Sequence, residues 1–367
     1  MAESQYMKLA LQLAEKGCGS VNPNPMVGAV IVKNGKIIGQ GYHAYFGGPH
    51  AERAALEDCS ESPAGATLYV TLEPCCHYGK QPPCTDAILK AGIRHVLVGS
   101  SDPNPLVSGK GIETLRKHGV TVTENVMRKE CDQLNEVFFH YIKTGRPYVI
   151  MKYAMTMDGK IATKTGASKW ITAETARLRV QQDRSRYAAI MVGVGTVLKD
   201  DPLLTCRLPE RRSPVRIVCD THLKTPLTSK LVRTADRYRT IIATCCEERS
   251  RWEPLTAAGC QLLLLPKSDG HTDLKALIHA LGNEKLDSIL LEGGGQLNWS
   301  ALQSGIVNKI HAYVAPKLFG GSGAPSPIGG PGIDTPDAAF RLSTPKVTLL
   351  QQDILLESEV ISCLPES

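Results

Sequence analysis

One histidine and two cysteines, together with a glutamate close to the histidine, are the residues of this chain best suited to chemistry. His50 and Glu52 are separated by a single alanine, Cys75 follows a proline, and Cys84 lies nine positions after Cys75. An imidazole and two thiolates are typical zinc ligands, and three protein ligands leave a fourth position for water, as in catalytic zinc sites. Zinc brings the pKa of that water to about 7, so hydroxide is available at neutral pH. The pattern therefore predicts a catalytic zinc held by His50, Cys75 and Cys84.

Glu52 is placed to move protons at this site. It lies on the same expected helical turn as His50, so its carboxylate can face the metal-bound water without binding the metal. From there it can take a proton from the water and pass it to a ring nitrogen and a leaving amine. Zinc deaminases carry the signature H-x-E followed by P-C-x-x-C, although here eight residues, not two, separate Cys75 from Cys84. We expect the chain to remove an amino group from a pyrimidine.

Two other interpretations of these residues stay open at this point. The histidine and the cysteines could be unrelated residues of the core. A structural zinc site would need a fourth protein ligand, which Cys76 or His77 could supply. The order His-x-Glu, Pro-Cys and then Cys, along a helix, a strand and a second helix, favours the catalytic interpretation.

The composition limits the class of protein. A length of 367 residues corresponds to about two domains, and a hydrophobic fraction of 42% is ordinary for a globular core. The net charge of +6 is scattered along the chain without a block of five or six basic residues. Such a charge fits phosphorylated small molecules better than a nucleic-acid tract.

The chain start and the cysteines indicate the compartment. The first 17 residues mix apolar residues with Glu3, Lys8, Glu15 and Lys16, which is typical of an amphipathic helix and not of a signal peptide. No apolar run approaches the length of a membrane span. We therefore expect a cytoplasmic, reduced protein without a membrane partner, in which clusters among the twelve cysteines bind metal or do chemistry.

Strand and helix patterns alternate through the first half and position the candidate ligands. Asn34-Gly35 predicts a hairpin turn between two strands. The expected elements are strands at 26–33, 36–42, 67–72, 96–98 and 120–122 and helices at 6–13, 51–59, 84–91 and 115–118. Cys84 thus opens a helix, where free amides and the positive end of the helix dipole favour a thiolate.

A domain boundary is expected near residue 146. The stretch 125–147 is helical in pattern and ends at Gly145-Arg146-Pro147, and a new strand pattern starts at Tyr148. We therefore expect domains 1–146 and 147–367. The second domain again alternates, with strands at 148–153, 188–192, 215–219, 240–243, 262–265, 289–291 and 310–314, helices at 173–186, 274–281 and 296–303, a long loop at 319–336 and a closing hairpin at 347–350 and 354–361.

Two glycine-rich segments follow strands in the second domain. Glu292–Gly295 precedes a helix, and Val192–Thr196 is a similar strand exit. Glycines let the backbone approach a phosphate, and a helix N-terminus offers free amides. Neither segment has the G-x-G-x-x-G pattern of dinucleotide-binding folds, so each could also be a tight turn. Both lie at the ends of strands where open α/β sheets bind ligands.

Taken together and in order, these motifs resemble the bifunctional riboflavin biosynthesis deaminase-reductase family of bacteria. The resemblance covers nearly the whole chain. It rests on Asn22–Gly28, Glu73–Cys84, Asp102–Pro105, Lys169–Thr172, Val192–Thr196, Asp200–Thr205 and Glu292–Gly295.

This resemblance implies a fold and two reactions. The fold would be a cytidine-deaminase-like three-layer α/β/α domain followed by a dihydrofolate-reductase-like α/β domain. The first would deaminate 2,5-diamino-6-(5-phosphoribosylamino)pyrimidin-4-one at C2 to 5-amino-6-(5-phosphoribosylamino)uracil. The second would reduce the ribosyl group to ribityl with NADPH. The expected ligands are one Zn²⁺ per chain, NADPH and a phosphoribosylated pyrimidine, with no nucleic-acid partner, and we expect a homo-oligomer.

The resemblance also implies roles for individual residues. In the deaminase it implies zinc ligands at His50, Cys75 and Cys84, a proton donor at Glu52, and bystander roles for Cys76 and His77. The deaminase pocket would be lined by Asn24, His43, Lys80, Asp102 and Asn104.

For the reductase the resemblance implies two sets of contacts. NADPH would contact Ala154, Trp170, Thr196, Asp200, Thr221 and the segment 294–300 that begins with Gly294 and Gly295. The substrate would contact Ser168, Arg184, Leu204, Arg207 and Glu292. The two arginines suit a phosphate, which a guanidinium binds in bidentate fashion. No residue stands out as a proton donor, because the cofactor supplies the hydride and the protein positions it.

Two competing functions remain to be weighed. A deaminase acting on a nucleic-acid base would share the zinc signature, but only 5% of the residues are aromatic and the second domain would have no role. A zinc-stapled nucleotide-binding module would unfold without metal and release no amine.

Overall fold

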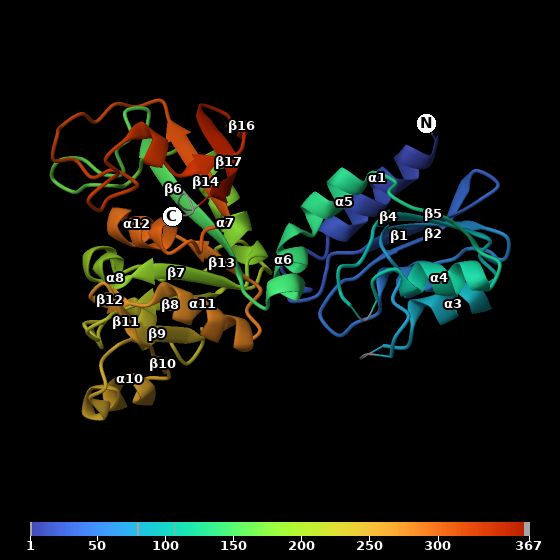
Figure 1. Cartoon of the computed structure of the whole chain (residues 1–367), viewed down its shortest axis with the longest axis horizontal. Coiled ribbons are helices and arrows are strands. Elements are labelled where there is room, and N and C mark those ends of the chain that lie inside the picture. Colours follow the sequence, from blue (N-terminus) through green and yellow to red (C-terminus); the bar gives the residue numbers. More distant parts are fainter. Residues whose placement is uncertain (1, 79–80, 106, 363–367) are drawn as a thin grey trace. The chain divides into compact units, whose positions relative to one another are not determined.

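The chain forms two compact units (Figure 1). The structure is a computed structural model that describes residues 2–78, 81–105 and 107–362. Unit 1 is Met1–Gly145 and unit 2 is Arg146–Ser367. Among the described helices, none combines the length and apolar character needed to cross a membrane.

Unit 1 is built on a five-stranded sheet in the order β2-β1-β3-β4-β5. The strands are β1 (Gly28–Lys33), β2 (Lys36–Tyr42), β3 (Thr67–Leu72), β4 (His95–Ser100) and β5 (Thr121–Thr123). β1 is antiparallel to both β2 and β3, whereas β3, β4 and β5 are parallel. The predicted Asn34-Gly35 turn is confirmed, because both residues have positive φ between the paired β1 and β2.

Helices cover both faces of this sheet and make three layers (Figure 1). Val30 and Val32 of β1 pack with α1 (Ala2–Glu15) and α5 (Arg128–Leu134). The alternate residues Ala29 and Ile31 pack in a second cluster with three further helices, α2 (Ala51–Glu57), α3 (Cys84–Lys90) and α4 (Lys110–Lys117). Successive strand side chains point to opposite faces, so the short apolar strands are buried on both sides. The predicted α/β/α arrangement is confirmed.

The helical stretch expected at 125–147 is divided at Asn135. The amide of Asn135 accepts a hydrogen bond from Met26 N (2.8 Å) and donates one to Met26 O (2.9 Å). Its backbone leaves helical geometry at φ −107° and ψ 21°, so α5 ends at Leu134 and α6 (Glu136–Thr144) begins after it. A contact across 109 residues therefore sets the start of α6.

Unit 2 contains a large sheet in the order β10-β9-β8-β7-β13-β6-β14-β17-β15, with β16 paired to β17. From β10 to β14 all neighbours are parallel, and β17 runs antiparallel to β14. The strands are β6 (Tyr148–Thr156), β7 (Ala189–Gly193), β8 (Val215–Cys219), β9 (Thr240–Thr244), β10 (Gln261–Leu264), β13 (Ser288–Leu291), β14 (Lys309–Ala315), β15 (Arg341–Leu342), β16 (Lys346–Leu350) and β17 (Asp353–Ser362). A small separate hairpin joins β11 (Lys267–Ser268) and β12 (His271–Thr272).

Helices also cover both faces of the second sheet. One face packs on α11 (Leu274–Asn283) and α12 (Gly295–Gln303). The other packs on α8 (Val194–Asp200), α9 (Lys230–Arg233) and α10 (Glu253–Ala257), while α7 (Glu174–Arg186) packs against β14 and β17. Two short 3₁₀ turns, Arg249–Arg251 and Pro336–Ala338, complete the regular structure.

The expected elements of unit 2 are largely confirmed, and the structure adds three short helices and the short strands β11, β12 and β15. α8 begins where the sequence indicated only a glycine-rich strand exit, and the short α9 and α10 were not expected. Helices of four to seven residues are too short for a clear periodic signal. The loop predicted at 319–336 is confirmed, since it contains no α-helix or strand and only its last residue, Pro336, belongs to a 3₁₀ turn.

Candidate functional site

His50, Cys75 and Cys84 converge on one point in unit 1. The sulfur atoms of Cys75 and Cys84 lie 3.5 and 3.3 Å from His50 Nδ1, and one ligand atom from each residue lies within 4.8 Å of the others. Bond lengths of 2.0–2.3 Å place the ligand atoms of tetrahedral zinc about 3.3–3.8 Å apart. The three side chains therefore fit a zinc ion, and no other described His, Cys, Asp or Glu joins the cluster.

The local chain explains why these ligands meet. Cys75 follows the end of β3, and His50 and Cys84 stand at the starts of α2 and α3, which cover the same face of the sheet. The backbone N–H of Cys84 also donates to the sulfur of Cys75 (3.4 Å). Hydrogen bonds from the Cys84 thiol and from His50 lower the pKa of Cys75. The site thus favours a thiolate at Cys75 before any metal is considered.

Glu52 lies on the first turn of α2 and is only 3% exposed. Burial raises the pKa of its carboxyl to about 7. It lines the same cavity as His50 and Cys75. A carboxyl group beside the ligand cluster, facing a cavity, can exchange protons with a molecule bound there.

A cavity of about 300 Å³ opens beside the cluster and contains four of the predicted pocket residues, namely Asn24, His43, Asp102 and Asn104. His43 Nδ1 donates to Pro49 O (2.9 Å), so its Nε2 accepts from the Asn24 amide (3.2 Å). Burial also lowers the pKa of His43, and burial raises that of Asp102 to about 6. The fifth predicted pocket residue, Lys80, lies outside the described residues.

The two residues that could have closed the zinc site are not part of the ligand cluster. Neither Cys76 nor His77 joins the three ligands, although His77 lines the cavity. Burial raises the pKa of the Cys76 thiol, which disfavours the thiolate form that metals bind. This geometry leaves a coordination position for solvent or substrate.

Several further residues of this cavity were not predicted, four of them on α6 and at the end of β3. Phe138, Tyr141 and Ile142 of α6 form one wall, and Glu73 lines it at the end of β3. The signal for α6 was a period-3.6 apolar stripe just before the domain boundary, but such a stripe more often marks a core-facing helix. Here the Asn135 amide, bonded to Met26, holds the helix beside the cavity.

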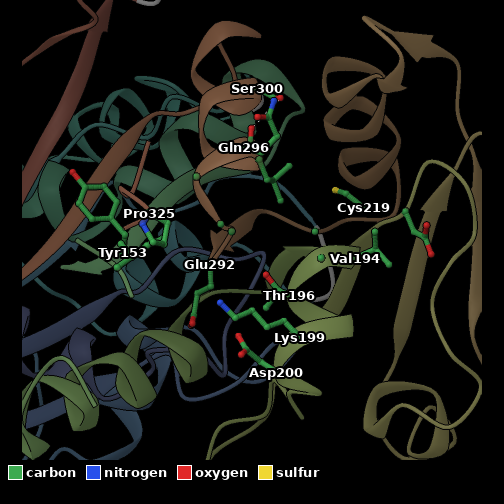
Figure 2. Close-up of a pocket in the computed structure, with 18 of the residues that line it drawn as sticks. Tyr153, Val194, Thr196, Lys199, Asp200, Cys219, Glu292, Gln296, Ser300 and Pro325 are labelled. Carbon is green, nitrogen blue, oxygen red and sulfur yellow. Dashed lines mark hydrogen bonds between the residues drawn. The ribbon is translucent and has the colours of Figure 1, made fainter. Parts of the chain in front are cut away.

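Unit 2 contains a larger cavity of about 700 Å³. It lies at the carboxyl ends of β6, β7, β8 and β13, the edge at which open α/β sheets bind ligands. Figure 2 shows Thr196, Asp200 and Glu292 facing it, with Gln296 and Ser300 on α12. The predicted residues that line it are Ala154, Ser168, Thr196, Asp200, Thr221, Glu292 and, from the segment 294–300, Gly294, Gly295, Gln296, Leu297 and Ser300.

The glycine-rich segment after β13 has the geometry expected for close backbone approach. Gly294 caps α12 in extended conformation, and Gly295 is the first helical residue. A Cβ added to Gly294 would meet no described atom within 4 Å, whereas one on Gly295 would lie 2.9 Å from Ser326 O. The segment is therefore open on the cavity side and tightly packed against the loop behind it, and α12 directs free amides to the cavity.

Three predicted contact residues are not in the cavity lining. Trp170 is 58% exposed and stacks with Arg177 (4.7 Å), while Leu204 is buried in the core beside α8 and α9. Arg207 is exposed and binds Gln181 through its backbone N–H. The structure leaves their contacts with a cofactor or substrate as predictions.

Arg184 is also absent from the lining, because it is bound to Glu292. Its Nε and Nη2 donate to the two carboxylate oxygens of Glu292 at 2.9 Å each, and its Nη1 donates to Thr205 O (3.2 Å). Lys152 of β6 lies 3.7 Å from the same carboxylate and lines the cavity. Burial alone raises the pKa of Glu292, but Arg184 and Lys152 hold it down at about 2. Lys152 was not predicted, since a lone lysine inside a strand carries no sequence signal.

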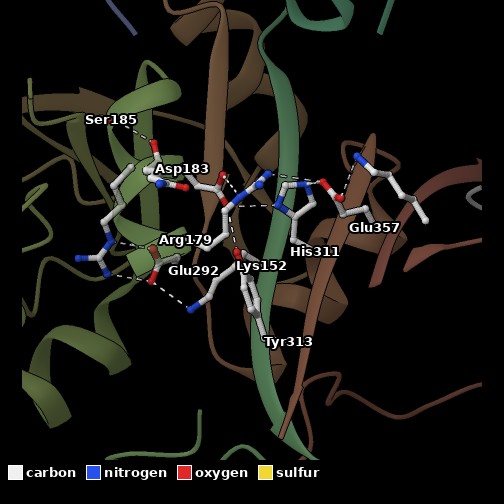
Figure 3. Close-up of polar contacts among 11 residues, drawn as sticks. Lys152, Arg179, Asp183, Ser185, Glu292, His311, Tyr313 and Glu357 are labelled. Carbon is white, nitrogen blue, oxygen red and sulfur yellow. Dashed lines mark hydrogen bonds and ion pairs between the residues drawn. The ribbon is translucent and has the colours of Figure 1, made fainter. Parts of the chain in front are cut away.

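A second polar network anchors the helix that carries Arg184 (Figure 3). Asp183 of α7 accepts a hydrogen bond from the Tyr313 hydroxyl (3.1 Å) and lies 3.4 Å from His311, both on β14. His311 lies 3.5 Å from Glu357 on β17. α7 is thus tied to two strands one residue before Arg184, which limits the positions that the guanidinium can take.

Comparison with known proteins gives matches over both units. Residues 1–100 match the model of the cytidine and deoxycytidylate deaminase zinc-binding region, and residues 147–356 match that of the RibD C-terminal domain. The riboflavin biosynthesis protein RibD of Actinobacillus pleuropneumoniae is 55% identical over 99% of this chain and 97% of its own length. That of Aquifex aeolicus is 44% identical over 96% and 97%.

Two solved structures match this chain over nearly its whole length. A diaminohydroxyphosphoribosylaminopyrimidine deaminase/5-amino-6-(5-phosphoribosylamino)uracil reductase from Thermotoga maritima superposes with a TM-score of 0.86 at 39% identity, covering 98% of this chain and 99% of that one. Acinetobacter baumannii RibD gives 0.87 at 34% identity with the same coverage.

Proposed function

This chain belongs to the RibD family and is a bifunctional deaminase and reductase of riboflavin biosynthesis, and on that premise we propose its substrates, its cofactor and the roles of its residues. The deaminase, residues 1–146, converts 2,5-diamino-6-(5-phosphoribosylamino)pyrimidin-4-one to 5-amino-6-(5-phosphoribosylamino)uracil. The reductase, residues 147–367, reduces the ribosyl group of that product with NADPH. The observation that carries the deaminase assignment is the convergence of His50, Cys75 and Cys84 beside Glu52.

In the proposed deaminase, His50, Cys75 and Cys84 hold zinc, and Glu52 moves the protons. Zinc supplies a Lewis acid that makes water a nucleophile near neutral pH. Glu52 takes one proton from the attacking water and passes it to the ring nitrogen, and then takes the second proton from the resulting hydroxyl group and passes it to the departing amine. Water and the C2 amino group are consumed, and a carbonyl group and ammonia are formed. Burial of Glu52 excludes competing solvent from this transfer.

The wall formed by α6 supports a flat heteroaromatic substrate. Phe138 and Tyr141 face the cavity that also contains Glu52. Aromatic rings pack favourably on other planar rings, in offset or edge-to-face geometry. We assign the pyrimidine to this wall, with Asn24, Asp102 and Asn104 offering polar groups to its edge. A nucleic-acid base would find the same wall, but that alternative gives no role to the reductase matched at 147–356.

In the proposed reductase, the cavity of unit 2 holds NADPH, which supplies a hydride when bound. The open backbone at Gly294 and the N-terminus of α12 suit a phosphate group. The eleven predicted residues of the lining border one continuous cavity. Glu292, which Arg184 holds in place, offers a hydrogen-bond acceptor to the sugar of the substrate. Lys152, which lies beside Glu292, offers a donor.

One experiment tests both halves of this proposal. The diaminopyrimidine ribotide is supplied with NADPH, and ammonia release and NADPH absorbance are followed together. We expect ammonia to appear first and NADPH to be consumed in equal amount after it. Zinc-depleted protein should do neither with this substrate, yet should still oxidise NADPH when given the aminouracil ribotide. NADPH oxidation without ammonia release from the diamino substrate would contradict the order of reactions.

A further inference from the structure

Glu73 is a buried carboxylate whose two oxygens are both held by backbone amides. Its side chain is 3% exposed. Oε2 accepts hydrogen bonds from Asp102 N (3.3 Å) and Gly109 N (3.0 Å). Oε1 accepts from Gly111 N (3.0 Å) and Ile112 N (3.3 Å). A buried carboxylate needs such donors, because an unsatisfied charge in the interior is costly.

The four amides belong to two segments, the loop after β4, which lines the deaminase cavity, and the start of α4. Asp102 is the second residue of the loop after β4 and lines the cavity. Gly109 is the left-handed N-cap residue of α4 at φ 78°, and Gly111 and Ile112 lie in the first turn of that helix. The first amides of a helix have no partner within it, and a negative charge is favourable at that end. Glu73 therefore fixes the loop and the helix together.

The same residue is joined to the metal-ligand side of the cavity. It lies two positions before Cys75, and its own N–H donates to Ser100 O (2.9 Å) at the end of β4. A Cβ added to Gly111 would lie 2.1 Å from Pro74 O, so α4 packs directly on the backbone before Cys75. The Glu73 side chain thus connects the segment that carries Cys75 with the loop that carries Asp102.

The loop after β4 in turn fixes two residues that line the pocket. Asp102 accepts a hydrogen bond from Asn104 N (2.8 Å) through Oδ1, so the backbone of Asn104 is fixed relative to Asp102. Both residues line the cavity beside Glu52. A displacement of 1 Å at a positioning group can lower a rate by about 10²-fold.

We propose that Glu73 is a positioning residue of the deaminase, which holds Asp102 and Asn104 at a set distance from the ligand Cys75. Glu73 does not touch the reacting atoms. This inference rests on the proposed binding of the pyrimidine beside Asp102 and Asn104. It assigns to the glutamate of the Glu73-Pro74-Cys75 run a role in substrate binding, separate from that of the metal.

The first test compares Glu73→Gln with Glu113→Gln. Glutamine keeps the size of the side chain but replaces one acceptor oxygen by an NH₂ group, which then faces two N–H donors. Glu113 lies in the first turn of α4, the helix whose amides Glu73 binds, and it is exposed and pairs only with Lys117 among the described residues. It therefore controls for loss of a carboxylate near the start of α4. The measurements are kcat and KM for ammonia release at 15 °C, zinc content, and reduction of the aminouracil ribotide by the same chain.

We expect kcat/KM of deamination to fall about 10- to 100-fold in Glu73→Gln, with KM rising at least about fivefold and zinc near one per chain. Glu113→Gln should stay within about twofold of the parent, and reduction should be unchanged in both. A KM within about twofold of the parent overturns the proposal, because partial unfolding lowers only the active fraction and hence kcat. Failure of the parent to release ammonia would instead refute the proposed function.

A second pair of variants decides the case in which Glu73→Gln loses zinc. Gly109→Ala strains only the loop end, where an added Cβ meets no described atom within 4 Å at φ 78°. Gly65→Ala imposes the same strain at φ 81° in equally open space away from the cavity. A rise in KM for Gly109→Ala alone supports the proposal. Equal behaviour of the two variants means that Glu73 serves only the metal site, which overturns it.

Discussion

Glu73 lines the cavity of unit 1 and Glu292 lines that of unit 2, and the two carboxylates are stabilised in different ways. Glu73 in unit 1 is held by four backbone amides. Glu292 in unit 2 is held by the side chains of Arg184 and Lys152. Amides are fixed by the fold itself, whereas guanidinium and ammonium groups sit on long side chains that must themselves be anchored.

This difference shows which groups fix the geometry of each site. In unit 1 short, rigid groups set the geometry, since the ligands, Glu52 and Glu73 lie at helix starts and strand ends. In unit 2 the position of Glu292 depends on Arg184, and Arg184 depends on α7, which the network of Asp183, His311 and Tyr313 ties to β14. We therefore expect the two sites to respond separately to mutation and to pH.

The largest expected effect is on one activity alone. Glu52→Gln should lower deamination about 10²- to 10⁴-fold, because it removes the group that we propose to move the protons. Zinc content and reduction of the aminouracil ribotide should be unchanged. Ammonia release, metal analysis and NADPH absorbance measure the three quantities. Deamination at the rate of the parent would refute the role of Glu52, and loss of both activities would break the independence of the two sites.

Removal of Arg184 should destabilise unit 2 and leave unit 1 intact. Arg184→Met leaves the half-buried Glu292, whose side chain is 12% exposed, without its bidentate partner. Breaking a fully buried pair costs about 3–5 kcal/mol, so we expect a loss at or below the lower end of that range. The three tryptophans, Trp170, Trp252 and Trp299, all lie in unit 2, so tryptophan fluorescence follows its unfolding selectively. Reduction should fall while ammonia release persists. Arg207→Met, an exposed arginine of the same unit, is the matched control for stability.

Acid should weaken the ion pair between Arg184 and Glu292 in unit 2 over a defined range of pH. The pKa of Glu292 is about 2 in the folded protein, below its ordinary value of 4.5, so the pair contributes stability above pH 4.5 and loses it as pH falls toward 2. This contribution is about 3 kcal/mol at neutral pH. The unfolding free energies of the parent and of Glu292→Gln, followed by tryptophan fluorescence, should converge between pH 4.5 and 2. A constant difference would argue against charge pairing.

A smaller effect is expected at the wall of the deaminase cavity. Phe138→Ala should raise KM for deamination about tenfold with little change in kcat, because loss of a ring contact costs about 1 kcal/mol or more. Phe139→Ala is the matched control, since Phe139 is the same residue type on α6 but does not line the cavity. Equal effects of the two substitutions would mean that α6 acts through packing and not through contact.

The smallest effect should come from Cys76. Cys76→Ser should keep zinc near one per chain and leave both activities unchanged, because Cys76 is not in the ligand cluster. Metal analysis after dialysis measures this directly, with Cys75→Ser as the comparison that loses zinc. Loss of metal in Cys76→Ser would make it a ligand and close the site to substrate.

The sequence by itself determined the chemistry of the deaminase and the order of the elements. The spacing of His50, Glu52, Cys75 and Cys84 was enough to predict the metal cluster, because each residue stands at the boundary of an element that local patterns define. The Asn34-Gly35 turn and the strand β1 could likewise be predicted from a few neighbouring residues. These features depend on neighbours within a few residues.

Only the tertiary structure decided which distant residues complete the two sites. Asn135 meets Met26 across 109 residues and so places α6 beside the cavity. Arg184 meets Glu292 across 108 residues, and Glu73 meets amides 29 to 39 residues away. A side chain bound to a distant backbone or partner leaves no periodic pattern in the sequence. Local spacing in the sequence therefore predicted the kind of chemistry. Long-range hydrogen bonds and ion pairs, which only the tertiary structure shows, position the residues of the two sites.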